Sequence, residues 1–263
     1  MMGPGQQGTI KEGDHMSGSQ SAHSVVRAYE TDEGDGARVT RLFPGRGMRD
    51  LDPFVLLDEF NLSPMGGFPN HAHRGFEAVT YMLEGEFHHR DTMGNDSVVS
   101  AGGVQRFTAG RGLVHSEMPG RGPRNRGLQL WVNLPRHLKR VEPSYQQVEP
   151  ESVPVRRVGT SIVRTIVGEG SPVRLRTPVR YLDISLEPVG MYLGSIPQDW
   201  RGLVYVLEGH VSLHGTEAWH GDSIKLVPGE TFTIMALNGP ARLALLSGRP
   251  LGEPIIHNGT FVD

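Results

Sequence analysis

The chain has 263 residues, of which 37% are hydrophobic, and a formal net charge of −3. This length suits one large domain or two ordinary ones, and so small a charge creates no field that would attract nucleic acid. The sequence contains no cysteine, which excludes disulfides, thiolate metal ligands and a cysteine nucleophile. Any metal ion must therefore be held by histidine, aspartate, glutamate or water.

The first 23 residues are rich in Gly, Ser and Gln and are predicted to form a disordered tail. This segment has no apolar core of the kind found in secretory signals. No apolar run in the sequence approaches the roughly twenty residues that a membrane helix needs. We therefore expect a cytoplasmic protein that does not bind a membrane.

Short strand-like runs follow one another from residue 25 to residue 246. The sequence has 35 Gly and 19 Pro, which favour tight turns. Few stretches have the 3.6-residue period of a helix, and a single helical turn is expected at Arg136–Arg140. The predicted fold class is all-β. The predicted strands are Val25–Tyr29, Arg38–Phe43, Phe54–Phe60, Ala78–Leu83, Ser97–Ser100, Gln129–Leu134, Ser161–Val167, Tyr181–Leu186, Leu203–Leu207, Val211–His214, Ser223–Val227, Phe232–Ala236 and Leu243–Leu246.

An internal repeat divides the chain into two halves. The segment FEAVTYMLEGEFHH (76–89) aligns with WRGLVYVLEGHVSLHG (200–215), in a register that places Tyr81 on Tyr205. A repeat of this length indicates duplicated domains. We predict a first domain over residues 24–142 and a second over 155–263, joined by a proline-containing linker at 143–154.

Metal-ligand residue types occur as two pairs in the first half. His71 and His73 are separated by one residue, and His115 and Glu117 repeat this spacing. Residues i and i+2 of a strand point to the same face. If the two strands face each other inside a barrel, three imidazoles and a carboxylate converge on one point. Such a set suits iron, manganese, copper or zinc.

The second half is predicted to lack these ligands. In the repeat register Ser195 falls on the position of His71, and Pro197 falls on that of His73. Neither replacement is a good metal ligand. One copy is therefore expected to bear the metal and the other to be structural or regulatory.

Longer motifs surround the four ligand-type residues. They are HAHRGFE (71–77), YMLEG (81–85) and TAGRGLVHSE (108–117), with RTPVRYLD (176–183) in the second half. These motifs resemble those of the pirin family, which are bicupins of the cupin superfamily, over roughly residues 25–262. The resemblance implies two tandem jelly-roll β-barrels with one Fe(II) ion in the first barrel. The family ligands fall on His71, His73, His115 and Glu117, the same four residues that the spacing selects.

Some alternatives stay open at the metal. Cupins in general often take a glutamate from the first motif, and Glu77 is that candidate here, although Glu117 is preferred. Glu77 is then expected to lie behind the ligands or to pair with Arg74 or Arg111. The same ligand set also fits Mn, Cu, Ni, Co or Zn.

This chain departs from the family pattern close to the site. Ala72 replaces the usual proline between the first two histidines. Arg106 replaces a tryptophan before the Thr-Ala-Gly motif. A charge thus replaces a bulky aromatic group, and the pocket lining and the substrate are the properties that this change is expected to affect.

The resemblance implies a dioxygenase of the quercetin type. Its substrates would be O2 and a small aromatic, flavonol-like compound, whose ring cleavage releases carbon monoxide. Glu117 is the first choice for the base that takes the substrate's hydroxyl proton, and Glu77 is the second. The alternative is an iron-dependent regulatory protein that binds a transcription factor or a metabolic enzyme without turnover. A monomer is the family expectation, and the small net charge predicts no direct contact with nucleic acid.

Overall fold

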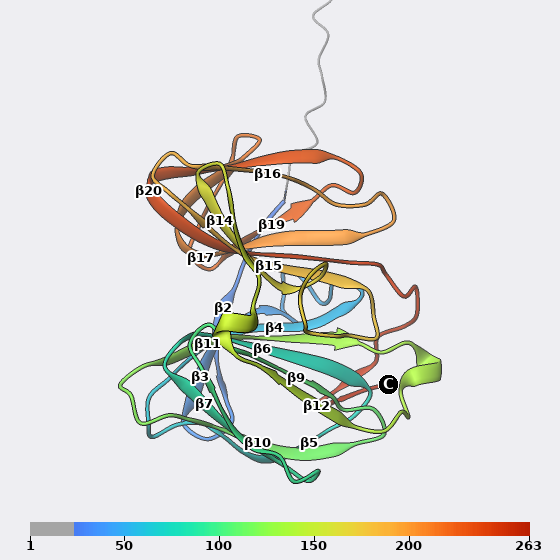
Figure 1. Ribbon diagram of the computed structural model, residues 1–263. Coiled ribbons are helices and arrows are strands. Elements are labelled where there is room, and N and C mark those ends of the chain that lie inside the picture. Colours follow the sequence, from blue (N-terminus) through green and yellow to red (C-terminus); the bar gives the residue numbers. More distant parts are fainter. Residues whose placement is uncertain (1–23) are drawn as a thin grey trace, which may run out of the picture.

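The computed structural model describes residues 24–263, which form two β-barrels stacked on each other (Figure 1). The predicted disordered tail, residues 1–23, lies outside the described residues. Within residues 24–263 the helical elements are two 3₁₀ turns, η1 (Arg136–Leu138) and η2 (Pro150–Ser152). No helix in this part of the chain is long and apolar enough to cross a membrane. The all-β prediction is confirmed, and η1 lies where one helical turn was expected.

The first barrel is built from two antiparallel sheets. The seven-stranded sheet has the order β12-β9-β6-β11-β4-β3-β2, and the four-stranded sheet has the order β5-β10-β7-β8. Their bounds are β2 (Tyr29–Glu33), β3 (Ala37–Phe43), β4 (Phe54–Leu62), β5 (Phe68–His73), β6 (Phe76–Glu84), β7 (Glu86–Asp91), β8 (Asp96–Ser100), β9 (Val104–Thr108), β10 (Leu113–Pro119), β11 (Asn125–Asn133) and β12 (Ser144–Val148).

One nine-stranded sheet forms the second barrel, with a path β1-β19-β17-β20-β15-β14-β13 from which β16 and β18 branch. The longest strands, β17 and β20, bend through the barrel and carry register shifts in their pairing. The bounds are β1 (Val25–Arg27), β13 (Val155–Val158), β14 (Ser161–Val167), β15 (Val179–Leu186), β16 (Met191–Ser195), β17 (Arg201–Leu213), β18 (Thr216–Trp219), β19 (Asp222–Leu226) and β20 (Thr231–Gly248).

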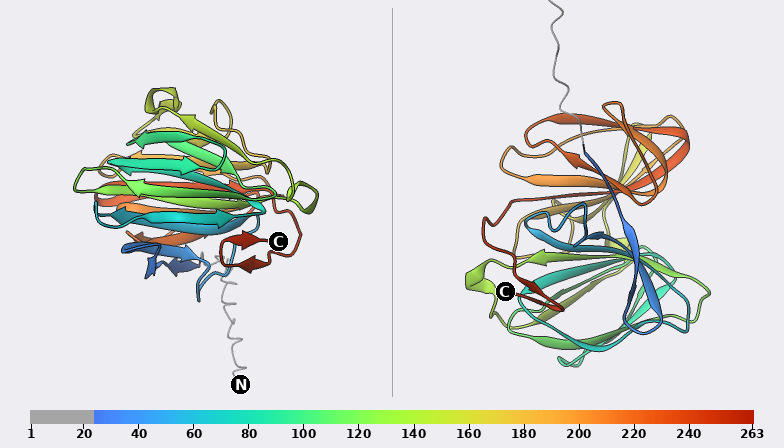
Figure 2. Two further views of the ribbon diagram at one scale, coloured as in Figure 1. Left: turned by 90° about the horizontal axis from the view of Figure 1, so that it is seen from below. Right: turned by 180° about the vertical axis from the view of Figure 1, so that it is seen from behind.

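The barrels exchange segments near both ends of the described chain (Figure 2). Strand β1 pairs with β19 of the second barrel. The last residues return to the first barrel as the hairpin β21 (His257–Asn258) and β22 (Phe261–Val262), where Val262 is fully buried. Within the predicted linker 143–154, β12 pairs with β9 as an edge strand of the first barrel. Strand pairing therefore differs from the predicted domain boundaries at three places, because each segment completes a sheet or a core in the other half.

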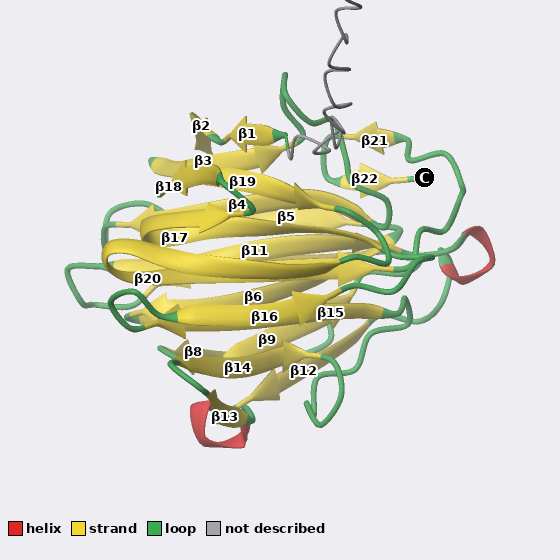
Figure 3. Ribbon diagram, turned by 90° about the horizontal axis from the view of Figure 1, so that it is seen from above, coloured by secondary structure: helices red, strands yellow, loops and turns green. Residues whose placement is uncertain are grey.

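The two barrels share one hydrophobic core. The large sheets are stacked (Figure 1), and seen from above their strands overlap (Figure 3). The side chains between them form one cluster of buried residues. Leucine and valine side chains of β4, β6 and β11 meet those of β15, β17 and β20. This cluster includes Leu57, Val79, Leu128, Leu130, Tyr181, Leu203, Ala244 and Leu246. Burial of this apolar surface supplies the main force that holds the barrels together.

A reciprocal pair of hydrogen bonds crosses the same interface. The Tyr81 hydroxyl of the first barrel donates to Asp183 of the second at 2.8 Å, and the Tyr205 hydroxyl of the second donates to Glu59 of the first at 2.8 Å. The register that places Tyr81 on Tyr205 also places Glu59 on Asp183. The duplication seen in the sequence is therefore preserved as a pseudo-symmetric interface.

An arginine completes each half of this interface. Arg242 Nε donates to Asp183 at 2.9 Å, and Arg126 Nε donates to Glu59 at 2.8 Å. Both carboxylates are nearly or fully buried, so each needs these donors to remain charged inside the protein.

Asp183→Ala is expected to destabilise the protein by about 3–5 kcal/mol, because Arg242 and Tyr81 lose their buried acceptor. Urea unfolding of the variant and the wild type measures the difference in free energy. Asp199→Ala is the matched control, since its ion pair with Arg249 is exposed and should contribute about 0–1 kcal/mol. Equal midpoints for Asp183→Ala and the wild type would show that the interface does not depend on this carboxylate.

Candidate metal centre

The four predicted ligands lie on two adjacent strands of the small sheet. Strands β5 and β10 pair antiparallel, with His115 opposite His71 and a register shift between His115 and Glu117. The strands are therefore neighbours in one sheet and do not face each other across the barrel as expected. Because their inward-facing residues are polar, neither strand stands out as an apolar run, which explains why both were missing from the predicted strands.

Three imidazoles converge at this position. The Nε2 atoms of His115 and His71 are 3.0 Å apart, and one ring nitrogen from each of His71, His73 and His115 lies within 4.8 Å of the others. His73 is 2% exposed and His115 is 1% exposed. This buried histidine cluster can hold a metal ion.

Backbone carbonyl groups orient two of these rings. The Nδ1 atom of His71 lies 2.8 Å from the carbonyl oxygen of Pro69, and that of His73 lies 3.3 Å from the carbonyl oxygen of Thr260. A carbonyl oxygen only accepts, so Nδ1 carries the proton and Nε2 presents its lone pair. This is the arrangement in which metal-binding histidines are commonly held.

Glu117 lies beside the histidines in a fully buried position. Its Oε2 accepts a hydrogen bond from Gln129 Nε2 at 3.0 Å, and its Oε1 accepts one from Gln105 Nε2. Burial raises the pKa of Glu117 to about 7, although the hydrogen bonds from Gln129, Thr80 and Gln105 oppose this shift. The carboxyl group is thus easily converted between its neutral and charged forms near neutral pH.

The same burial keeps the imidazoles neutral. It lowers the pKa of His73 to about 3, with a further contribution from His71. The pKa of His115 is lowered still further by burial and by its histidine neighbours, and that of His71 is also lowered by burial. Neutral imidazoles bind a cation without first losing a proton. A cluster of neutral imidazoles fits a divalent first-row metal, and Glu117 joins His115 in a second set of potential ligand atoms.

His89 is a further buried histidine at the centre. A second set of potential ligand atoms, from His89, His115 and Glu117, also lies within 4.8 Å. The Nε2 atom of His89 lies 3.2 Å from Asp91, while its buried Nδ1 has no hydrogen-bond partner among the described residues. The contact with Asp91 fits a supporting role for His89 beside the histidine cluster.

Glu77 has other partners than those expected. Its carboxylate accepts hydrogen bonds from the Thr108 hydroxyl at 2.8 Å and from the backbone N–H of Arg176 at 2.7 Å. Arg74 pairs instead with Asp263, and Arg111 pairs with Glu142. The predicted pairing of Glu77 with either arginine is therefore wrong, because both arginines reach exposed carboxylates while Glu77 is buried towards the second half of the chain.

Arg106 does not line the site either. Along β9, Gln105 reaches Glu117 and Phe107 stacks on His73 with ring centres 5.4 Å apart. Arg106, between them, points to the other face and donates to Ser144 and Gln146. Because side chains alternate between the two faces of a strand, the charge of Arg106 lies outside the pocket.

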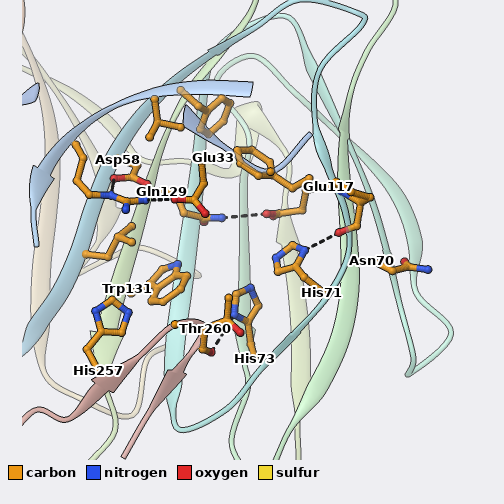
Figure 4. Close-up of a pocket in the computed structure, with 18 residues that line it drawn as sticks. Glu33, Asp58, Asn70, His71, His73, Glu117, Gln129, Trp131, His257 and Thr260 are labelled. Atoms are coloured by element: carbon orange, nitrogen blue, oxygen red, sulfur yellow. Dashed lines mark hydrogen bonds and ion pairs between the residues drawn. The ribbon is translucent and has the colours of Figure 1, made fainter. Parts of the chain in front are cut away.

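A pocket of about 440 Å³ opens beside the histidines (Figure 4). His71, His73 and Glu117 line it, and Gln129 and Trp131 of β11 lie close to them. Apolar side chains form much of the remaining wall. These are Val39, Leu56, Phe60 and Phe68. The volume falls in the range of pockets that bind small molecules, about 300–1,000 Å³.

The C-terminal hairpin closes one side of this pocket. His257, Gly259 and Thr260 line it, and Val262 N donates to the carbonyl oxygen of Arg74 at 3.0 Å. Sequence reasoning missed these residues, because their contact with the histidines spans almost the whole chain. Gln105 and Gln129 were missed as well, although their positions in inward-facing registers of β-strands offered a signal.

Comparisons with known proteins agree over most of the chain. The family model described as Pirin matches residues 36–132, and that of the pirin C-terminal cupin domain matches residues 181–263. Pirin from Homo sapiens is 39% identical over 261 residues, covering 94% of this chain and 89% of that protein.

Solved structures share the same architecture. A structure described as quercetin 2,3-dioxygenase from Acinetobacter baumannii has a TM-score of 0.83 and 32% identity, and the match covers 91% of this chain and 90% of that one. The bacterial pirin YhhW from Escherichia coli, in complex with nickel(II), has a TM-score of 0.72 and 21% identity, with coverage of 87% and 99%. At that identity the second match supports the fold alone.

We expect the wild type to bind about one divalent ion per chain, and His73→Ala to lose most of it, because one buried imidazole donor is removed. Metal analysis after dialysis against a weak chelator measures the stoichiometry. His137→Ala is the matched control, since His137 is exposed on η1. Full metal retention by His73→Ala would contradict the assignment of this ligand.

His89→Gln is expected to retain the ion with an affinity reduced by about 10–100-fold, the usual effect of removing a supporting residue. A competition titration with a chromophoric chelator measures the dissociation constant. A loss as complete as that of His73→Ala would instead make His89 a ligand.

Proposed function

The chain belongs to the pirin family, and from this premise we propose that it is a metal-dependent dioxygenase of the quercetin type. It would cleave the ring of a flavonol with O2 and release carbon monoxide. The observation that carries the proposal is that three of the candidate ligands, His71, His73 and Glu117, line a pocket with apolar and aromatic walls. The similarity to a structure described as quercetin 2,3-dioxygenase also supports this proposal.

We assign the ligand role to His71, His73, His115 and Glu117, with Fe(II) as the preferred ion. When bound, Fe(II) supplies Lewis acidity and redox chemistry at this end of the pocket. The protein supplies neutral imidazoles, and backbone carbonyls fix the tautomers of two of them, His71 and His73, in advance. Preorganisation of this kind avoids the free-energy cost of ordering the ligands upon binding.

Glu117 is the proposed base for the substrate's hydroxyl proton. Its position supports this role, because Glu117 lines the pocket beside the histidines and a general base must come within hydrogen-bond reach of the proton it removes. The Oε2 atom accepts one hydrogen bond, from Gln129, and is the atom at which we place the incoming proton. Gln105 and Gln129 hold the carboxylate in position while the proton moves.

Glu77 is a weaker candidate for this base. It is fully buried and is not among the residues that line the pocket. Both of its carboxylate oxygens already accept short hydrogen bonds, from Thr108 and Arg176. A base must come within hydrogen-bond reach of the proton it removes, and this position does not allow it.

The aromatic wall is suited to a planar substrate. Trp131 and Phe76 stack with ring centres 4.1 Å apart, which holds the indole in place at the edge of the pocket. Phe60 and Phe87 stack in the same way at 4.9 Å. Rigid aromatic faces bind a flat ring at a low entropic cost and exclude water from the centre.

We expect Fe(II)-reconstituted protein to consume O2 and release carbon monoxide with quercetin, and His73→Ala to lose this turnover. An oxygen electrode measures the O2 consumed, and capture by haemoglobin measures the carbon monoxide released. His137→Ala should retain full activity. If the wild type binds one metal per chain but shows no turnover, the proposal fails and the regulatory alternative, binding to a transcription factor or a metabolic enzyme, becomes the better account.

A further inference from the structure

We propose that Glu33, Arg41 and Asp58, a charged triad in the wall of the same pocket, bind hydroxyl groups on the substrate ring that lies away from the metal centre. The inference deepens the proposed function and rests on it. It assigns the substrate to the class of neutral polyhydroxylated aromatic compounds and excludes aromatic acids.

The triad is held together by direct hydrogen bonds. Arg41 Nε and Nη2 donate to the two oxygens of Asp58 at 2.8 and 2.6 Å, and Nη2 also donates to Glu33 at 2.7 Å. The three residues come from β2, β3 and β4, which are neighbours in the large sheet, with Arg41 directly opposite Asp58. A two-point contact of this kind fixes the guanidinium plane.

The triad lines one continuous pocket with His71, His73 and Glu117. In Figure 4, Asp58 lies on the opposite side of this pocket from His71, with Glu33 and Gln129 between them. A ligand that extends from the histidines across the pocket therefore passes Glu33 and points towards Asp58.

The burial of these charges needs an explanation. The side chain of Arg41 is 15% exposed and that of Asp58 is 7% exposed, in a pocket whose other walls are largely apolar. Burial raises the pKa of Asp58 to about 6 even though Arg41 lowers it, so the carboxylate is only partly compensated. A buried ion pair contributes little net stability compared with apolar residues of similar size. A role in recognising a ligand accounts for charges at this position.

The charge balance predicts which ligand groups fit. Two carboxylates and one guanidinium leave a net charge of −1. Carboxylates only accept hydrogen bonds, so phenolic hydroxyl groups are suitable partners, whereas a carboxylate on the ligand would be repelled. Glu33 is the accessible member of the triad, because its side chain is 44% exposed.

The test compares three probes on Ni(II)-loaded protein without O2, so that binding is measured in the absence of turnover. The probes are quercetin, 3-hydroxyflavone, which has no other hydroxyl group, and 3-hydroxyflavone with a carboxylate on its 2-phenyl ring. Isothermal titration gives each dissociation constant. Glu33→Gln removes one charge of the triad, and Glu30→Gln on the same strand is the matched control, since Glu30 is exposed and does not line this pocket.

We expect the wild type to prefer quercetin to 3-hydroxyflavone by about tenfold, the equivalent of one good hydrogen bond. In Glu33→Gln this preference should fall several-fold and binding of the carboxylated probe should tighten, because the net charge of the wall becomes zero. A purely structural role for Glu33 would weaken all three probes together. Asp58→Asn should change the same two ratios in the same direction.

Unchanged ratios in Glu33→Gln, or no binding of any probe by the wild type, would overturn the inference. These results are independent of the oxygen assay. If the ratios shift but the Fe(II) protein shows no turnover, the proposed reaction fails and the triad still stands as a ligand site. If turnover occurs and the ratios do not shift, only the role of the triad fails.

Discussion

The structure depends on the shared hydrophobic core between the two barrels. Either large sheet would expose a broad apolar face if it stood alone, and each buries that face against the other. The buried carboxylates Glu59 and Asp183 are tolerated there only because a tyrosine from the opposite barrel and an arginine donate to each of them. The interface thus combines a non-directional attraction with polar contacts that fix one orientation.

This packing explains how a barrel without the candidate ligands contributes to the metal centre. Because the barrels are fixed to each other, the last residues of the chain can leave the second barrel and lie against the first. The carbonyl of Thr260 then determines which nitrogen of His73 is free, and Glu77 ties the first barrel to the backbone of Arg176. In this structure the duplication gives one half that carries the candidate ligands and another half that helps to position them.

The period of two along a β-strand made the fold class and the cluster of His71, His73 and His115 predictable. His71 and His73, or His115 and Glu117, need only strand geometry to share a face. Strands β5 and β10 were missing from the predicted strands, because their inward-facing residues are polar and the usual apolar pattern of a strand is absent. Long-range partners had no local signal at all: Thr260 beside His73 and Arg176 beside Glu77 depend on how the halves pack. Arg106 was expected to affect the pocket because it is close to the site residues in sequence. The alternation of side chains along β9 instead places Arg106 on the face away from the pocket.

The pocket has two polar regions with different physical requirements. At the histidines, burial keeps the imidazoles neutral and therefore able to bind a cation. At the triad of Glu33, Arg41 and Asp58, the charges remain because they neutralise one another in part. A cation at the first region would be attracted by the net negative charge of the second, so the two are electrostatically compatible across one pocket. A ligand that spans both must then be electron-rich at one end and offer hydrogen-bond donors at the other, a combination that a polyhydroxylated aromatic ring provides.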